Sequence, residues 1–322
     1  MIDGGEETLA AGELGSIDIS DRIGRVPRRL TFADSSLFET VDNDAIDAWL
    51  NSQSTRRTGW IHELERFHPR LIAFAAVVIL LVVGVYRYAL PALVEVAVAV
   101  TPPVVPELMS ASTMKTLDTT VFSPSRLSAS EIERIREGFL RIASKSGRGP
   151  SGYNLNFRKG GPIGPNAFAL PDGTLVITDE LIRLADGDRD MITGVLAHEI
   201  GHVEYDHSLR QLYRVAGMTG LIMLIAGDVG SGVEEVLTDG TALLALSYSR
   251  EAESQADRHS VELMDKAGLD PAAIGRFFAL LESKLGDHDE TSMLSTHPGT
   301  PERRKAIDDY AATFRSSKAA GQ

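Results

Sequence analysis

The sequence contains no cysteine and fewer basic than acidic residues. Its 322 residues include 32 lysines and arginines against 45 aspartates and glutamates, which gives a formal net charge of −13 at pH 7. Without cysteine the chain forms no disulfide and offers no thiolate to a metal ion, which is compatible with an oxidising compartment. The acidic balance argues against nucleic acid as a partner, because nucleic-acid binding depends on a basic surface. A hydrophobic content of 43% with 24% charged residues allows one large domain plus an appendage.

Long apolar runs are also scarce, and the longest lies in the first third of the chain. Residues 71–86 carry no charge, and residues 88–90 extend the run beyond Arg87, whose charged end can reach the membrane surface. Residues 71–90 therefore reach the length of about 20 residues that a helix needs to cross a bilayer. A buried helix of a soluble protein is the alternative, but the run has no polar face to show to water. We expect a transmembrane helix, with the lipid bilayer as its partner.

Positive charge is concentrated before this run. Four arginines shortly precede it, and one follows at once: Arg56, Arg57, Arg66 and Arg70 against Arg87. Segments rich in lysine and arginine stay in the cytoplasm. The sequence therefore predicts a cytoplasmic N-terminus and a C-terminal part outside the cytoplasm.

A second apolar run covers residues 215–227. It is too short to span a bilayer comfortably, and its glycines argue against a rigid straight helix. It can pack in a protein core, or it can form a hydrophobic hairpin that touches the outer leaflet of the same membrane. The sequence leaves both interpretations open.

The clearest chemistry lies in the segment His-Glu-Ile-Gly-His at positions 198–202. Positions four apart share a helix face, so His198 and His202 can direct both imidazoles at one metal ion. Glu199 lies close enough to hold the water that such a metal would activate. Two surface histidines on a polar helix are the alternative. The small apolar neighbours instead predict a buried helix, and buried ionisable groups need a reason.

A catalytic zinc ion takes three protein ligands and keeps one position open, so a third ligand is needed. Glu253 and Asp257 are four residues apart and share a helix face, whereas Glu251 points elsewhere. This spacing suits Glu253 as the ligand and Asp257 as a carboxylate that orients a ligand histidine. A charged, solvated helix is the alternative. The paired histidines, which end 51 residues before Glu253, make the ligand interpretation the better one.

His297 stands directly before Pro298. A residue before proline favours an extended or turn conformation, which suits a loop that presents a side chain to a cleft. Taken alone, a histidine–proline pair indicates only a surface turn.

The remaining pattern predicts an α+β fold, mainly helical with a small β-sheet. Residues 130–145 read as an amphipathic helix. Polar and apolar residues alternate over 153–157, as in a β-strand. Residues 174–178 are expected to form a paired strand after an Asp-Gly turn. Near the N-terminus, residues 29–32 and 37–40 flank a turn and suggest a β-hairpin, which a short helix follows.

Together these motifs resemble one family, the membrane-associated zinc metallopeptidases (gluzincins) of the CAAX prenyl endopeptidase, HtpX, BepA and mitochondrial Oma type. The resemblance covers about residues 125–312 and implies a zincin-like domain with one Zn²⁺ per chain. The roles it implies are zinc ligand for His198, His202 and Glu253, general base for Glu199, second carboxylate for Asp257, and cleft residue for His297 and Arg303. Gln255 departs from many bacterial members, which carry an acidic residue there.

The resemblance implies a zinc-dependent endopeptidase that acts on polypeptides, with misfolded or envelope proteins as a substrate class. His297, or Arg303 through it, could stabilise the oxyanion of the transition state, or His297 could occupy the open zinc position and restrain activity. The strand that holds Thr174 and Val176 could present an edge to an extended peptide. A non-proteolytic, chaperone-like membrane binder is an alternative. A prenyl-protein peptidase is disfavoured, because that relative has many spans.

We therefore expect a single-pass protein of the bacterial inner membrane, with its catalytic part outside the cytoplasm. The expected organisation is a disordered start (1–20), a small cytoplasmic module (21–68), the transmembrane helix (69–90), a linker (91–124), the metallopeptidase domain (125–316) and a tail (317–322).

Overall fold

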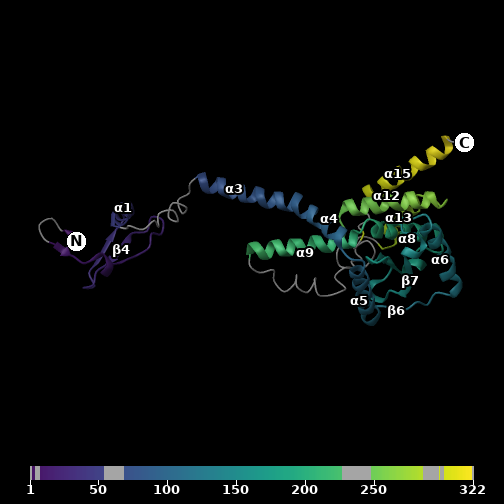
Figure 1. Cartoon of the computed structure of the whole chain (residues 1–322), viewed down its shortest axis with the longest axis horizontal. Helices are drawn as coiled ribbons and strands as arrows, with labels where there is room; N and C mark the ends of the chain where they lie inside the picture. The colour runs from purple at the N-terminus through teal and green to yellow at the C-terminus, as the bar shows by residue number, and fades with distance from the viewer. Residues whose placement is uncertain are drawn as a thin grey trace. The chain divides into compact units, whose positions relative to one another are not determined.

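The chain divides into two compact units, Met1–Leu81 and Val82–Gln322. Figure 1 shows the computed structural model, with its helices and strands labelled along the chain. The residues that the structure describes are 2–3, 8–53, 69–226, 248–285, 297 and 301–320.

Before the long apolar helix, the described part of the first unit holds short strands, a 3₁₀ turn and one α-helix. The described strands are β1 (Ile2–Asp3), β2 (Thr8–Ala10), β3 (Asp18–Ile19), β4 (Arg28–Thr31) and β5 (Leu37–Thr40), and the helices are η1 (Leu14–Ser16) and α1 (Asn43–Gln53). The expected hairpin is confirmed, because β4 and β5 pair antiparallel with Leu30 opposite Phe38. The buried Arg28 ties this sheet to the helix through an ion pair of 2.5 Å with Asp47.

Within residues 1–20, the described segments 2–3 and 8–20 contain three short strands. The strands β1 and β2 pair with each other, and β3 joins β4 with Ile19 opposite Leu30. A two-residue strand carries too little periodicity to be recognised in a glycine-rich and acidic segment. Its stability comes from the neighbouring strand and not from its own sequence.

A long apolar helix follows, built from α3 (Pro69–Gly84), the π-helical turn η2 (Val85–Ala89) and α4 (Leu90–Val100). Within the described residues, the segment Leu71–Val100 is the one helix long and apolar enough to cross a membrane. Its 30 residues would measure about 45 Å, more than the about 30 Å of a hydrocarbon core. The wide turn precedes Pro91, which has no backbone N–H to donate to residue 87, so the helix widens there.

The second unit contains a four-stranded sheet in the order β6-β7-β9-β8. Its strands are β6 (Ser123–Pro124), β7 (Asn154–Lys159), β8 (Ala167–Ala169) and β9 (Thr174–Thr178). The turn between β8 and β9 fits its sequence, because Gly173 has φ +95° and Asp172 Oδ1 accepts a hydrogen bond of 2.8 Å from the Thr174 N–H. The strands β7 and β9 run parallel.

This order corrects the expected substrate edge. β9 is an inner strand, with β7 on one side and β8 on the other. Its backbone groups are therefore used within the sheet, and Val176 is fully buried. Neither Thr174 nor Val176 lies on a strand that can accept an added peptide strand. The free edge beside β9 belongs to β8.

Helices make up most of the second unit. After α4 they are α5 (Val104–Thr120), α6 (Ala129–Ala143), η3 (Pro150–Gly152), η4 (Gly161–Ile163), α7 (Asp179–Leu184), α8 (Arg189–Glu204), α9 (His207–Ala226), α12 (Arg250–Lys266), α13 (Ala273–Leu285) and α15 (Pro301–Ala320). The expected amphipathic helix is confirmed as α6, which begins with a capping box of Ser128 and Glu131. Its buried face carries Ile135, Phe139 and Ile142.

The core of this unit is built around α8. Every residue from position 192 to position 203 is buried, and α8 packs against α6, α12, α13 and β8. Glycines let two partners approach closely. A Cβ atom on Gly201 would lie 3.0 Å from the Ala256 Cα of α12, and one on Gly194 would lie 3.0 Å from the Ile274 backbone nitrogen of α13. The fold is thus a mainly helical α+β fold with its sheet beside the central helix.

We expect Gly201→Ala to lower the free energy of unfolding by about 1–3 kcal/mol, because the added methyl group meets the α12 backbone, which cannot move aside cheaply. Gly220→Ala is the matched control. No heavy atom lies within 4 Å of a Cβ at that helical position, and alanine favours a helix over glycine by about 1 kcal/mol. Chemical denaturation of the purified chain measures both changes. Equal stability of the two variants would refute the packing argument.

Candidate metal centre and active site

Four side chains of types that can bind a metal ion meet in the core of the second unit: His198 and His202 of α8, Glu253 of α12, and His297. All four are buried, and one ligand atom from each lies within 4.8 Å of the others. The two Nε2 atoms of His198 and His202 are 3.0 Å apart, and each lies 3.5 Å from an oxygen of Glu253. His297 Nδ1 lies 3.3 Å from His198 Nε2 and 2.9 Å from Glu253 Oε1. We call these four residues the donor cluster.

The spacing of the donor cluster fits a tetrahedral zinc ion. Zinc lies about 2.0–2.2 Å from histidine nitrogen and carboxylate oxygen, so two donors of a tetrahedron are about 3.3–3.5 Å apart. Five of the six donor pairs are separated by 2.9 to 3.5 Å, and every pair lies within 4.8 Å, distances that side-chain rotations can bring to those of a tetrahedron. Imidazole and carboxylate without thiolate are also the donor types of catalytic zinc sites. The residues present therefore fit the metal.

Glu199 lies beside the donor cluster. Both of its carboxylate oxygens are buried, and neither has a hydrogen-bond partner among the described residues. His297 Nε2 lies 3.6 Å from Glu199 Oε1. Burial raises the pKa of the Glu199 carboxyl above its ordinary value. A buried carboxylate without a partner is costly for folding, which points to a chemical use.

Asp257 and Arg303 contact members of the donor cluster: Asp257 contacts His198, and Arg303 contacts Glu253. Asp257 Oδ1 lies 3.0 Å from His198 Nδ1, so it can hold the ring with Nε2 toward the cluster. Arg303 pairs with both oxygens of Asp257, at 2.5 and 2.7 Å, and with Glu253 Oε2 at 2.6 Å. Burial would raise the pKa of Asp257, but hydrogen bonds from Arg303 and His198 hold it below its ordinary value.

The structure places Arg303 against two carboxylates. Its Nε and Nη2 groups contact Asp257 and Glu253, and its guanidinium lies 4.5 Å from the centre of the Phe278 ring. These contacts suit a residue that positions Asp257 and Glu253.

Sequence reasoning missed a second chain of contacts behind His202. His207 Nδ1 lies 2.9 Å from His202 Nδ1, and His207 Nε2 lies 3.1 Å from Gln255 Oε1. Burial lowers the pKa of the His202 ring well below its ordinary value and that of His207 to about 4, so both rings are neutral near pH 7. Tyr248 stacks on the His202 ring at 4.0 Å. The sequence signal was a third histidine at position 207, close behind the paired two.

This chain of contacts fixes the tautomer of His202. The amide oxygen of Gln255 only accepts a hydrogen bond, so His207 donates to it from Nε2. His207 Nδ1 then accepts the proton of His202 Nδ1–H. The lone pair of His202 is left on Nε2, the atom that faces the donor cluster. Gln255, which departs from the acidic residue of many relatives, thus performs this step without a charge.

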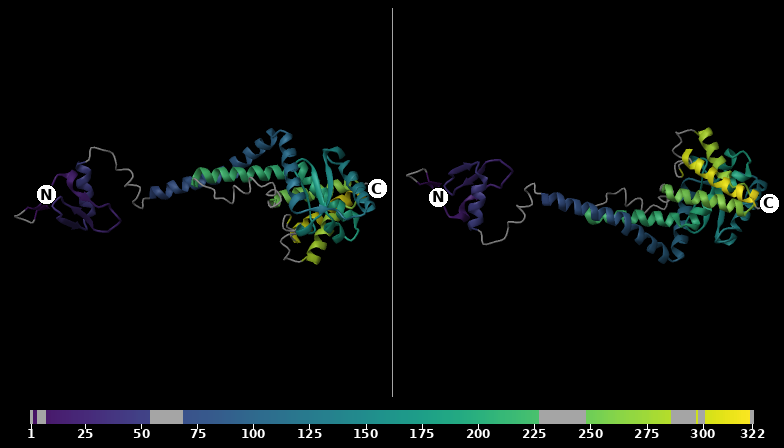
Figure 2. Two further views of the ribbon diagram at one scale, coloured as in Figure 1. Left: turned by 90° about the horizontal axis from the view of Figure 1, so that it is seen from below. Right: turned by 90° about the horizontal axis from the view of Figure 1, so that it is seen from above.

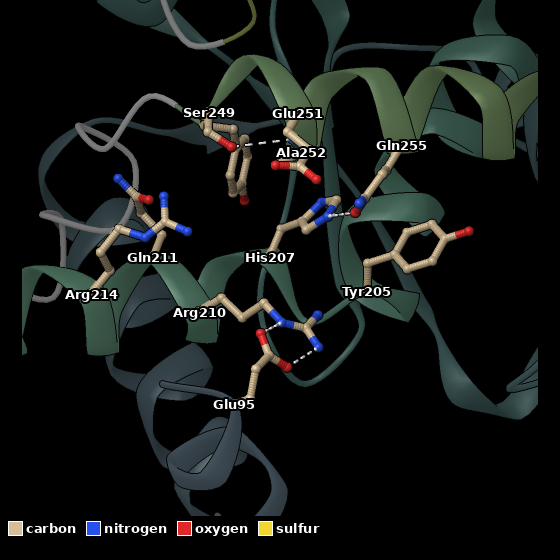
Figure 3. Close-up of a pocket in the computed structure, with 11 residues that line it drawn as sticks. Glu95, Tyr205, His207, Arg210, Gln211, Arg214, Ser249, Glu251, Ala252 and Gln255 are labelled. Carbon is tan, nitrogen blue, oxygen red and sulfur yellow. Dashed lines mark hydrogen bonds and ion pairs between the residues drawn. The ribbon is translucent and has the colours of Figure 1, made fainter. Parts of the chain in front are cut away.

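A pocket of about 350 Å³ borders His207. Figure 3 shows the hydrogen bond between His207 and Gln255 on one side of it and the ion pair of Arg210 with Glu95 on the other. No member of the donor cluster lines this pocket. It reaches the residues that orient His202 and does not contain the reacting atoms.

Comparisons with known proteins place these residues in context. The sequence model of peptidase family M48 matches residues 129–311, and a domain of unknown function (DUF7092) matches residues 1–53. Metalloprotease YcaL of Escherichia coli (strain K12) is 28% identical over 189 residues, which are 58% of this chain and 73% of that protein. Metalloprotease LoiP of the same organism is 30% identical over 177 residues, 52% of this chain and 67% of that protein.

The beta-barrel assembly-enhancing protease of Escherichia coli (strain K12) is 31% identical over 152 residues, but these are only 31% of that protein. The resemblance that the motifs indicated is confirmed by these matches. Since the matched segment is more than half of the chain and contains the whole donor cluster, this chain belongs to peptidase family M48 and is a zinc metalloendopeptidase.

Proposed function

We propose that the chain is a membrane-anchored endopeptidase in which His198, His202 and Glu253 bind zinc and Glu199 acts as general base. The observation that carries this proposal is the donor cluster with a buried carboxylate, free of hydrogen-bond partners among the described residues, beside it. When bound, the zinc ion would polarise the scissile carbonyl and lower the pKa of a bound water from about 15.7 toward about 7.

The protein side chains move the proton. Glu199 accepts it from the attacking water and delivers it to the amine of the leaving peptide. The raised pKa of Glu199 brings the carboxyl closer to the working pH, which favours both transfers. Asp257 keeps the His198 ring in place, and His207 does the same for His202. Both metal-binding rings are therefore oriented before substrate arrives.

His297 acts as a restraint on the resting enzyme. Its Nδ1 stands in the fourth corner of the donor cluster, 3.3 Å from His198 Nε2, where a catalytic site keeps a position open for water or substrate. A role in stabilising the oxyanion would require His297 to leave this corner, because a donor must point at the reacting oxygen.

Polypeptides are the substrates of this family, and the finer substrate class is part of the proposal. β8 is the last strand of the sheet on the side of β9 and packs against α8, so an extended peptide that adds to the sheet beside the site would pair with β8. This mode binds backbone more than side chains and gives weak sequence specificity. One relative is named for enhancing beta-barrel assembly, and misfolded or misassembled envelope proteins are the substrate class that we propose. An intact, buried Glu199 argues against a chaperone-like binder without activity.

We expect that His198→Ala, His202→Ala and Glu253→Ala each remove zinc, whereas Glu199→Gln keeps zinc and loses turnover. Metal content by plasma mass spectrometry and digestion of casein measure the two properties. A chelator should abolish activity, and added zinc should restore it. Full zinc occupancy in Glu253→Ala would refute the ligand assignment.

His207→Ala serves as the control for orientation. It leaves all four members of the donor cluster in place and should weaken zinc binding by about 10–100-fold, the range for loss of a residue that orients a ligand. Zinc binding equal to that of the unchanged protein would show that His207 is only a packing residue.

His297→Ala should raise basal proteolysis of a peptide substrate, with zinc still bound, because it clears the fourth corner of the donor cluster. If His297 instead stabilises the oxyanion, kcat should fall by about 10²–10³. Steady-state kinetics separate the two roles, because the substitution raises activity in the first case and lowers it in the second. Unchanged kinetics would reject both and leave His297 as a turn residue.

We further propose that the catalytic unit lies outside the cytoplasm of a bacterial inner membrane, on the basis of the arginines before the span. An alkaline phosphatase reporter, which is active only outside the cytoplasm, should be active after Gln322 and inactive before Leu71. The opposite pattern would reverse the orientation.

A further inference from the structure

The polarity of α9 changes abruptly along its length. Its first part carries His207, Arg210 and Arg214, whereas residues 215–226 contain no charged side chain. Near the end of the helix, three large apolar side chains in succession are exposed: Ile222 by 43%, Met223 by 52% and Leu224 by 83%. The end of this helix therefore presents an apolar surface that the described residues leave uncovered.

The neighbouring helix α4 changes polarity at the same level. Glu95 of α4 pairs with Arg210 through two contacts of 2.8 Å. Closer to the start of α4, Leu90 packs against Gly217, so tightly that a Cβ there would lie 2.4 Å from Leu90 Cδ1. The two helices run antiparallel, as Figure 2 shows. Both helices carry a charged residue where Glu95 meets Arg210, and both are apolar where Leu90 meets Gly217.

The residues of the apolar helix indicate where this change from charged to apolar side chains lies relative to the bilayer. Leu90 lies three residues beyond Arg87, and Arg87 stands between Tyr86 and Tyr88. Tyrosine and arginine side chains of this kind mark the surface of a bilayer. From Gly217, the remaining nine residues of α9 extend about 13 Å in the direction opposite to α4, toward lower residue numbers of the span. They therefore reach past the level of the two tyrosines.

We infer that residues 218–226 insert into the bilayer leaflet on the side of the catalytic unit, and that lipid acyl chains are what covers Ile222, Met223 and Leu224. The reason to choose lipid is continuity with the span, because α9 packs on the helix that itself emerges from the bilayer. The depth matches that of helices that lie about 5–10 Å into the boundary of headgroups and acyl chains. Arg210 and Arg214 then stand at the level of the lipid phosphates.

One consequence rests on the proposed function. His207, the first residue of α9, contacts His202 of the donor cluster, and ten residues separate it from Gly217, which lies at the level of the bilayer surface. A helix of this length measures about 15 Å. The active site is thus held about that far above the membrane surface, within reach of polypeptides that project from it.

The absence of cysteine allows a direct test on the full chain in lipid nanodiscs. Single cysteines at Leu224→Cys and Met223→Cys carry a polarity-sensitive fluorophore, and some of the lipids carry a nitroxide quencher on the acyl chain. Val83→Cys, inside the span, is the positive control. Leu140→Cys on α6 is the matched negative control, because Leu140 is an exposed leucine, at 44%, far from the span in sequence.

We expect the labels at Leu224→Cys and Met223→Cys to be quenched by the lipid nitroxide nearly as strongly as at Val83→Cys, and to resist iodide in the water. The label at Leu140→Cys should respond only to iodide. Quenching of the α9 labels by iodide alone would place the helix end in water. Protection from both quenchers would mean that protein covers it, as in core packing or a second copy of the chain. Either result overturns the inference, and neither depends on zinc or on proteolysis.

Discussion

The close packing of α8 against α12 is the constraint on which the active site depends. Gly201 meets the backbone of α12 at Ala256, and Ser260 of α12 donates a hydrogen bond of 2.8 Å to the carbonyl of Gly194. These contacts set the distance between two helices that carry His198, His202 and Glu253. Ligand geometry for zinc tolerates only a few tenths of an ångström, so a side chain at position 201 would disturb the metal centre as well as the core.

Burial of so many ionisable groups is possible because nearly all of them have partners. His198 contacts Asp257, Asp257 contacts Arg303, and Arg303 also contacts Glu253. Burial alone would lower the pKa of His198, but the two carboxylates raise it to about 9. Glu199 is the exception among these groups, because its oxygens have no hydrogen-bond partner in the described part of the chain. The structure thus gives partners to the groups that would hold a metal, and leaves without a hydrogen bond the group that would transfer a proton in the proposed mechanism.

Local spacing explains why part of the site could be predicted. His198 and His202 share a face because both lie on one helix, and the same holds for Glu253 and Asp257. Nothing local shows that His207 contacts His202. The helix α8 ends at Glu204, and Asp206 adopts φ +49°, so the chain turns sharply before α9 begins.

The strand order and the side-chain contacts between distant residues could not be predicted from the sequence either. The sequence of β9 is that of a buried strand. Its place inside the sheet depends on its pairing with β7, which lies about twenty residues earlier in the chain. The oxyanion role of Arg303 was inferred from its position after His297. The ion-pair partners of Arg303 lie on α12, and one of them, Asp257, precedes it by 46 residues. Sequence patterns of one helix cannot show which carboxylate of another helix an arginine reaches.

The short link between α8 and α9 would join the proposed metal centre to the proposed membrane contact. Only Tyr205 and Asp206 separate the two helices, and the first residue of α9, His207, contacts His202. An α-helix transmits displacement along its axis because its backbone hydrogen bonds resist bending. If lipid holds the far end of α9, then the same rigid element sets both the height of the active site and the orientation of a zinc ligand. A change at Leu224 should therefore be judged by zinc binding as well as by membrane contact, since the two share one helix.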